Sequence, residues 1–182
     1  MSVREIELLG SEILRQRAMD VDAVDGELRA LIRDMFETMY DAEGIGLAGP
    51  QIGVGRRVIV VDVREGDHQP FALINPRLVE SSRDTTRAEE GCLSIPGIAG
   101  VVERPETVVV EGLDEKGETV RIEAEGLLAR CLQHEIDHLD GVLFVDRLSP
   151  LKRNMVLKRY RNLQAEAPDG RPKRKPSSRA RG

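Results

Sequence analysis

The stretch "CLQHEIDHLDG", residues 131–141, decides the fold because it places two of the chain's three histidines four residues apart, with Glu135 directly after the first. On an α-helix, side chains four residues apart lie one above the other on the same face. His134 and His138 can therefore present their imidazoles to one metal ion, with Glu135 beside it. The H-E-x-x-H pattern is typical of such a site; the alternative is a polar helix end with two surface histidines.

A catalytic metal ion needs a third protein ligand and an open position for water. Cys131 shares the helical face but lies seven residues from His138, roughly 10 Å along the axis, so we expect it to line a pocket as a small apolar group. A third ligand from downstream, as in a metallopeptidase, would have to be Glu166 at the edge of the basic C-terminal end. Upstream, Cys92 in "AEEGCLSIPG" offers a thiolate from a segment that we expect to be irregular.

The ligand types are informative about the metal. A thiolate with two imidazoles is a sound set for a divalent transition metal. On ligand chemistry alone, zinc is the first expectation. Taken by itself, Cys92 would more often be a buried structural cysteine, so the prediction depends on its partnership with the two histidines.

Working outward, hydrophobic spacing predicts the other elements. Residues 25–42 predict an amphipathic helix capped by Asp25. The Gly-rich loop 43–55, "EGIGLAGPQIGVG", is too rich in Gly and Pro for regular structure, and "RRVIVVDV" (56–63) predicts a strand buried on both faces. Residues 71–79 predict a strand broken by Pro76, and 106–126 predict a hairpin that turns at "DEKG".

Two helices are expected in the C-terminal part of the chain. One begins at Leu127, carries the two histidines and ends with Gly141 as its C′ residue. The other begins with a Ser149 cap and Pro150, and it is strongly basic. Residues 168–182 have no apolar periodicity and predict a disordered tail.

Composition limits the class of protein. The 182 residues fit one domain. Aromatic content of 3%, without Trp, disfavours single-strand nucleic-acid binding by base stacking. Only two cysteines occur and no apolar run approaches the roughly 18–20 residues of a membrane span, so we expect a protein of the reducing cytoplasm with no membrane association.

Charge is distributed unevenly. Residues 147–182 carry twelve Lys and Arg against two acids, a net charge of +10, which leaves −15 on residues 1–146. The basic end suits an anionic partner such as RNA, although a solvated tail that only aids solubility is an equal alternative.

Three segments in this order and spacing resemble the motifs of the peptide deformylase family: "GIGLAGPQ" (44–51), "EGCLS" (90–94) and "HEIDH" (134–138). The resemblance extends from residue 1 to about residue 165. It implies an α+β fold in which antiparallel sheets pack around the metal-binding helix, with an N-terminal helix and a basic C-terminal helix. We therefore expect a catalytic domain at 1–167 and a basic tail at 168–182.

The resemblance implies a hydrolase that removes the N-formyl group from the initiator methionine of nascent chains and releases formate. Cys92, His134 and His138 would hold one metal ion, usually Fe²⁺ in this family and replaceable by Ni²⁺, Co²⁺ or Zn²⁺. Glu135 would take a proton from water and pass it to the departing amine. The side-chain amide of Gln51 and the backbone N–H of Leu93 would stabilise the oxyanion.

The resemblance also implies a substrate pocket. Its residues would be Gly44, Ile45, Gly46, Gly91, Leu127 and Cys131. Two positions depart from the family pattern: Gly49, where Ala is frequent, adds backbone freedom near Gln51, and Arg130 stands where an apolar wall residue is expected. For Arg130 we expect the aliphatic stem in the pocket wall and the guanidinium at the rim.

Alternatives remain at this point. "GIGLAG" lacks the Lys-Ser/Thr ending of a phosphate loop and precedes a strand, which disfavours nucleotide binding. An H-E-x-x-H metallopeptidase would cleave unformylated peptides. A ribosome- or RNA-associated protein with a vestigial metal site would use only the basic end; for a deformylase, that end would dock near the ribosomal exit tunnel.

Overall fold

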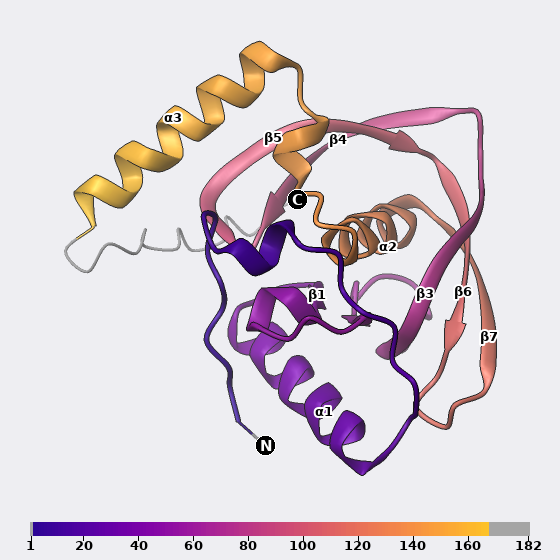
Figure 1. Ribbon diagram of the computed structural model, residues 1–182. Coiled ribbons are helices and arrows are strands. Elements are labelled where there is room, and N and C mark those ends of the chain that lie inside the picture. The colour runs from indigo at the N-terminus through magenta and orange to yellow at the C-terminus, as the bar shows by residue number, and fades with distance from the viewer. Residues whose placement is uncertain (1, 168–182) are drawn as a thin grey trace.

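The computed structural model describes residues 2–167, which fold around a central helix (Figure 1). The helices are α1 (Gly26–Asp41), α2 (Gly126–Leu139) and α3 (Pro150–Glu166), with 3-10 helices η1 (Glu12–Arg15), η2 (Gly49–Ile52) and η3 (Phe144–Arg147). The strands are β1 (Gly46–Ala48), β2 (Val58–Val61), β3 (Phe71–Ser81), β4 (Thr85–Cys92), β5 (Ile95–Pro105), β6 (Thr107–Leu113) and β7 (Thr119–Glu125). The tail predicted at 168–182 lies outside the described residues.

All strand pairs in the two sheets are antiparallel. The larger sheet has the order β1-β2-β3-β6-β7, and β4 pairs with β5 in a separate hairpin. Figure 1 shows α2 in the middle of the molecule, with the strands curving around it. The predicted α+β class is confirmed. In the part of the chain that the structure describes, no helix is long and apolar enough to cross a membrane.

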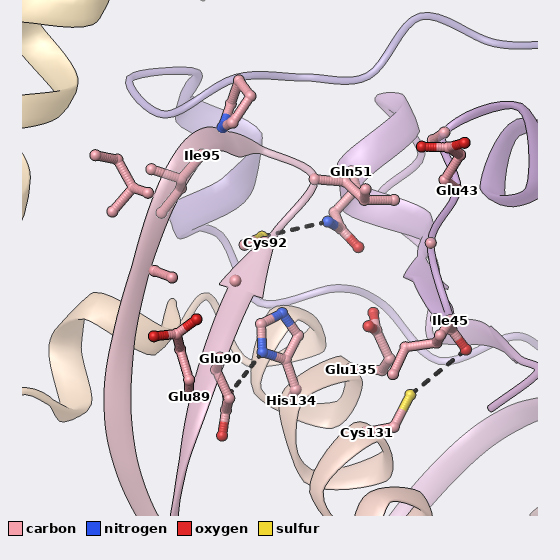
Figure 2. Close-up of a pocket in the computed structure, with 18 of the residues that line it drawn as sticks. Glu43, Ile45, Gln51, Glu89, Glu90, Cys92, Ile95, Cys131, His134 and Glu135 are labelled. Carbon is pink, nitrogen blue, oxygen red and sulfur yellow. Dashed lines mark hydrogen bonds and ion pairs between the residues drawn. The ribbon is translucent and has the colours of Figure 1, made fainter. Parts of the chain in front are cut away.

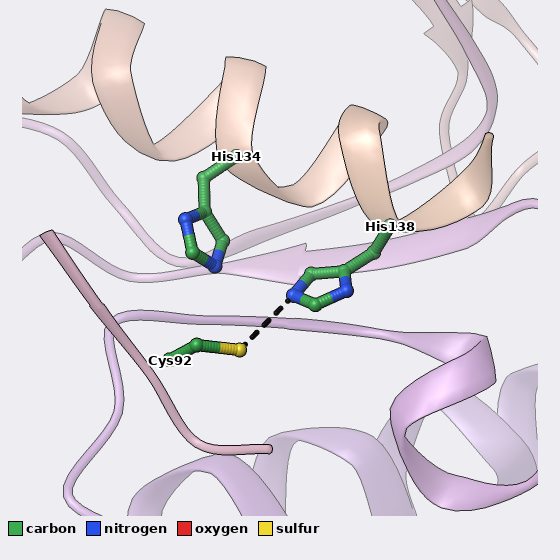
Figure 3. A group of neighbouring side chains, drawn as sticks. All are labelled: Cys92, His134 and His138. Atoms are coloured by element: carbon green, nitrogen blue, oxygen red, sulfur yellow. Dashed lines mark hydrogen bonds between the residues drawn. The ribbon is translucent and has the colours of Figure 1, made fainter. Parts of the chain in front are cut away.

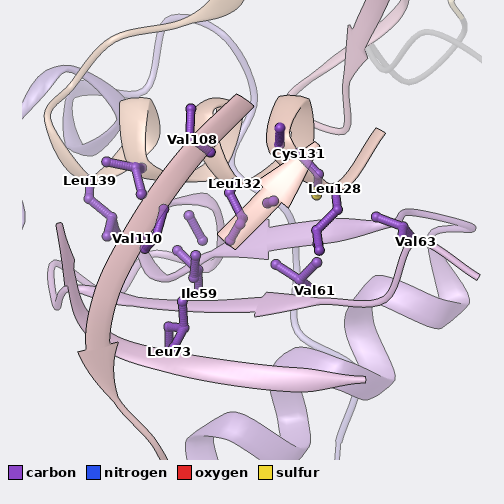
Figure 4. Packing of buried hydrophobic residues seen from close by; sticks show 14 of the residues in the cluster. Ile59, Val61, Val63, Leu73, Val108, Val110, Leu128, Cys131, Leu132 and Leu139 are labelled. Carbon is purple, nitrogen blue, oxygen red and sulfur yellow. The ribbon is translucent and has the colours of Figure 1, made fainter. Parts of the chain in front are cut away.

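Strand β2 explains why the sheet is covered on both faces. Successive side chains of a strand point to opposite faces. Val58 and Val60 belong to the apolar cluster that includes the buried face of α1, whereas Ile59 and Val61 belong to the cluster around α2. Figure 4 shows Ile59 and Val61 beneath Leu128 and Leu132 of α2. The predicted strand buried on both faces is confirmed.

The helix ends follow the predicted chemistry. The carboxylate of Asp25 accepts a hydrogen bond from Leu28 N at 2.9 Å at the start of α1. Gly141 follows α2 with φ 74°, a conformation that glycine adopts without strain. Ser149 Oγ accepts from Lys152 N at 3.4 Å and Pro150 opens α3. Of these residues, Gly141 marks the end of α2, the helix that carries the two histidines.

Two expectations about irregularity were wrong. β3 is not broken by Pro76 but runs on to Ser81, because the pairing register with β6 shifts between Ile74 and Arg77 and the missing N–H of proline falls in that irregular stretch. The Gly-rich loop does contain regular structure: β1 pairs with β2 as the edge strand, and η2 follows it.

Gly49 has a packing role that differs from the added backbone freedom we expected. A Cβ at this position would lie 2.7 Å from the carbonyl oxygen of Arg56 and 2.8 Å from that of Val54. Both contacts are with backbone, which yields less easily than a flexible side chain. In this chain, the absence of a side chain at residue 49 lets the following loop pack against η2.

Candidate metal centre

Helix α2 presents its two histidines on one face. The ring centroids of His134 and His138 lie 5.0 Å apart, and the two rings meet edge to face. Figure 3 shows both rings pointing from α2 toward the same space. The i, i+4 spacing produces this arrangement because one turn of helix advances about 5.4 Å.

The structure brings Cys92 to these histidines. The Cys92 Sγ lies 3.3 Å from His138 Nε2, and the ligand atoms of Cys92, His134 and His138 lie within 4.8 Å of one another (Figure 3). Cys92 does not lie in an irregular segment, as we expected, but ends β4, and a tight connection leads directly into β5 at Ile95. Strand pairing therefore fixes the thiol opposite α2.

Glu90 orients one of the histidines. Its Oε1 lies 3.0 Å from His134 Nδ1, which leaves Nε2 of that ring as the nitrogen available to an ion. Sequence reasoning did not single out Glu90. It stands two residues before Cys92 on β4, and the period of two in a strand puts both side chains on the same face; this was the signal that could have identified it.

The carboxylate of Glu90 is itself held by two arginines. Arg104 Nε donates to it at 2.6 Å, and Arg130 Nη1 also donates at 2.6 Å. Burial alone would raise the pKa of Glu90, but the hydrogen bonds from His134 and Arg104 and the charge of Arg104 bring it well below its usual value. Glu90 is therefore a buried carboxylate that stays ionised.

Arg130 does not place its guanidinium at the pocket rim, as we expected. The side chain is buried, and besides Glu90 the guanidinium donates to the carbonyl oxygens of Val102 and Thr86, both at 3.0 Å. A guanidinium has five donors and cannot lose its charge, so it serves here as a link between α2 and the β4–β5 hairpin.

Glu135 lies beside the ligand group with one oxygen unsatisfied. Among residues 2–167, its buried Oε2 has no hydrogen-bond partner. Burial raises the pKa of Glu135 to about 7, which suits a group that both accepts and releases protons near neutral pH. Gly46 lies very close: a Cβ there would be 2.6 Å from Glu135 Oε1 and 2.8 Å from Cys131 Sγ. A side chain at residue 46 would therefore displace the Glu135 carboxylate or the Cys131 thiol.

Gln51 reaches the same place from η2. Its Nε2 lies 3.6 Å from Cys92 Sγ and 3.3 Å from Ser94 Oγ, while its Oε1 accepts from Ala48 N at 2.9 Å. Because the carbonyl of the amide is held by backbone, its NH₂ group is directed toward the thiol. Leu93, which follows Cys92, lines the same cavity.

The residues fit a divalent metal ion. Burial lowers the pKa of His138 well below its usual value, which favours the neutral imidazole that a metal ion requires. Besides Glu135 Oε2, His138 Nδ1 is buried without a hydrogen-bond partner in the described part of the chain. A thiol, two imidazoles and a buried carboxylate that lacks a partner match the donor set of a catalytic site for a transition metal.

The ligand group opens onto a cavity of about 810 Å³. All six predicted substrate-pocket residues line it: Gly44, Ile45, Gly46, Gly91, Leu127 and Cys131. Cys131 is not in the ligand group, and its Sγ instead lies 3.6 Å from the carbonyl oxygen of Ile45 (Figure 2). Sequence reasoning missed other lining residues, among them Glu43, Glu89, Ile95, Ile98 and Arg159.

Comparison with known proteins gives one consistent family. The polypeptide deformylase family model matches residues 3–154. A peptide deformylase of Rhizobium meliloti is 52% identical over 88% of this chain and 93% of its own length. The crystal structure of a peptide deformylase from Legionella pneumophila is 49% identical and superimposes with a TM-score of 0.83, covering 92% of this chain and 100% of the other.

A further relative has been solved with a ligand bound. The peptide deformylase of Synechococcus elongatus, solved in complex with actinonin, is 46% identical with a TM-score of 0.82, and the match covers 93% of this chain and 92% of the other. The agreement in sequence and structure extends over nearly all of the described residues. The chain therefore belongs to the polypeptide deformylase family, whose enzymes remove the N-formyl group from newly made peptides.

Proposed function

We propose that this chain deformylates N-formylmethionyl peptides at the cavity beside α2, with Cys92, His134 and His138 holding the catalytic metal ion. The observation that carries the proposal is the convergence of these three ligand atoms within 4.8 Å, next to the buried carboxylate of Glu135. Glu166, the alternative third ligand, ends α3 and is not in the ligand group.

The side chains take distinct roles in the proposed reaction. A divalent ion bound here would act as a Lewis acid and lower the pKa of water in the site. Glu135 takes a proton from that water at Oε2 and delivers it to the amine that departs. The Gln51 NH₂ and the backbone N–H of Leu93 donate to the oxygen of the former formyl group as negative charge develops there.

The proposed native metal is Fe²⁺, with Ni²⁺, Co²⁺ or Zn²⁺ able to replace it. Cysteine and imidazole ligands accept all four ions, and site geometry together with availability in the cell selects between them. We further propose that the protein works in the cytoplasm, where both cysteines stay reduced.

The function is tested by formate release. Protein purified without oxygen and loaded with Fe²⁺ is expected to release one formate per molecule of formyl-Met-Ala-Ser consumed, and to leave unformylated Met-Ala-Ser intact. Formate is measured by a coupled dehydrogenase assay and the peptide by mass spectrometry. Metal-loaded protein that releases no formate would refute the proposal, and cleavage of the unformylated peptide would favour the metallopeptidase alternative.

We also propose that α3 docks on ribosomal RNA near the exit tunnel, where the substrate emerges. Lys152, Lys158 and Arg161 are exposed on this helix, and Leu151 and Met155 expose 71% and 63% of their surface. A cationic surface of this kind binds phosphate in a salt-dependent way. The positive charge of α3 thus adds to that of residues 168–182, which follow it in the sequence.

Charge reversal tests the docking. The triple substitution Lys152→Glu, Lys158→Glu and Arg161→Glu is expected to weaken co-sedimentation with ribosomes about tenfold at low salt. Formate release from free peptide should be unchanged. The control reverses three exposed arginines elsewhere, Arg33, Arg77 and Arg83, for the same change in net charge. Equal loss of ribosome binding in both variants would show a general charge effect and no docking through α3.

A further inference from the structure

One wall of the cavity is formed by the short connection between α1 and β1. Glu43, Gly44 and Ile45 all line the cavity, and Figure 2 shows Glu43 and Ile45 on the side opposite Glu89. Glu43 has φ 54°, in the left-handed region that residues other than glycine rarely adopt. Such a conformation persists only where surrounding contacts hold it.

The contacts come from outside the cavity. Arg64, in the β2–β3 connection, donates from Nη2 to the carbonyl oxygen of Gly44. Its guanidinium carbon also lies 5.6 Å from the centroid of the Tyr40 ring, which is a cation–π distance. Arg64 itself has φ 55°. The hydrogen bond from Arg64 to Gly44 O therefore has a left-handed residue as its donor, and another, Glu43, directly before its acceptor.

Asp62 completes this arrangement. Its Oδ2 accepts from Tyr40 Oη at 2.8 Å and its Oδ1 accepts from Arg64 N at 3.1 Å. The backbone N–H of Asp62 donates to the carbonyl oxygen of Ile45 at 2.8 Å. The carbonyl groups of Gly44 and Ile45 are thus both held from the β2 side, by Arg64 and Asp62.

Two backbone N–H groups of the wall are held by α1. Glu43 N donates to Tyr40 O at 2.9 Å, and Gly44 N donates to Met39 O at 2.8 Å. Without the Arg64 contact, Gly44 O would lose its only hydrogen bond among the described residues. A glycine with a free carbonyl group is the easiest place for this wall to change conformation.

We propose that Arg64 is a positioning residue for substrate binding: through Gly44 O it fixes the Glu43–Ile45 wall in the conformation that receives the peptide. This inference rests on the proposed function. Arg64 does not line the cavity, so it acts on the substrate only through the wall. Preorganisation of this kind lowers the cost of binding and leaves the chemical step at Glu135 unchanged.

The test combines steady-state kinetics with hydrogen exchange. Arg64→Ala is expected to raise KM for formyl-Met-Ala-Ser roughly tenfold, with kcat nearly unchanged. The loss of one hydrogen bond from a charged donor typically has an effect of about this size. Amide exchange in the 43–46 segment should become faster at the same time. Arg64→Lys, which keeps a charged donor, should recover part of the loss. Arg83→Ala, at an exposed site, is the control.

The outcomes separate the inference from the proposed function. Unchanged KM, or unchanged exchange at residues 43–46, would overturn the role of Arg64. A roughly tenfold fall in kcat with no change in KM would also overturn it, because that pattern indicates damage to the catalytic group. If the unsubstituted protein releases no formate, the proposed function fails, while the exchange experiment still reports whether Arg64 orders the wall.

Discussion

Replacing Glu135 with Gln is expected to abolish most formate release while the protein still binds its metal ion. The substitution keeps the size of the side chain but removes the carboxylate that we propose takes a proton at Oε2, an atom that is buried and has no partner among residues 2–167. General acid–base catalysis contributes about 10²–10⁴-fold to rate. We therefore expect kcat to fall by about that factor, measured alongside the metal content per chain.

The control for this result is Glu123→Gln, an isosteric change at an exposed position on β7. It should leave both kcat and metal content unaltered. If Glu135→Gln retained more than about a tenth of the original kcat with full metal content, Glu135 would not be the proton carrier. If the variant lost its metal ion, the lower rate would say nothing about proton transfer and would point to a ligand role.

Replacing Glu90 with Gln is expected to cause a large loss of stability. Glu90 is 6% exposed and accepts hydrogen bonds from Arg104, Arg130 and His134. Removing one partner of a buried ion pair typically costs about 3–5 kcal/mol, because the remaining charges stay buried without compensation. The melting temperature should fall by on the order of 10 °C for a domain of this size, as measured by calorimetry.

A second effect should accompany the first. Because Glu90 fixes the ring of His134, its loss is expected to weaken metal binding by about 10–100-fold. The control is Glu103→Gln on β5, whose exposed pair with Arg87 is solvated and should contribute little. Equal melting temperatures for Glu90→Gln and the unsubstituted protein would contradict the account of the buried charge network.

The parts of the fold that could be predicted depend on local sequence signals. Capping by Asp25 and Ser149, the C′ glycine at 141 and the hairpin of β6 and β7 are each determined within a few residues of the chain. The same holds for His134 and His138, whose spacing on one helix is a local property.

The missed features depend on contacts between distant segments. Pro76 remains in β3 because β6 pairs with an irregular register, which the local sequence of β3 does not reveal. The guanidinium of Arg130 turns inward because it donates a hydrogen bond to the buried carboxylate of Glu90, forty residues away in the sequence. The long β4–β5 hairpin, which holds Cys92, was likewise not predicted.

The central claim is that Cys92, together with His134 and His138, binds the metal ion. Its most direct test is the absorption spectrum of the protein loaded with Co²⁺, since a thiolate bound to Co²⁺ gives a charge-transfer band in the near ultraviolet. We predict that the band is present in the unsubstituted protein and in Cys131→Ser, and absent in Cys92→Ser. A band that persists in Cys92→Ser and disappears in Cys131→Ser would contradict the ligand assignment.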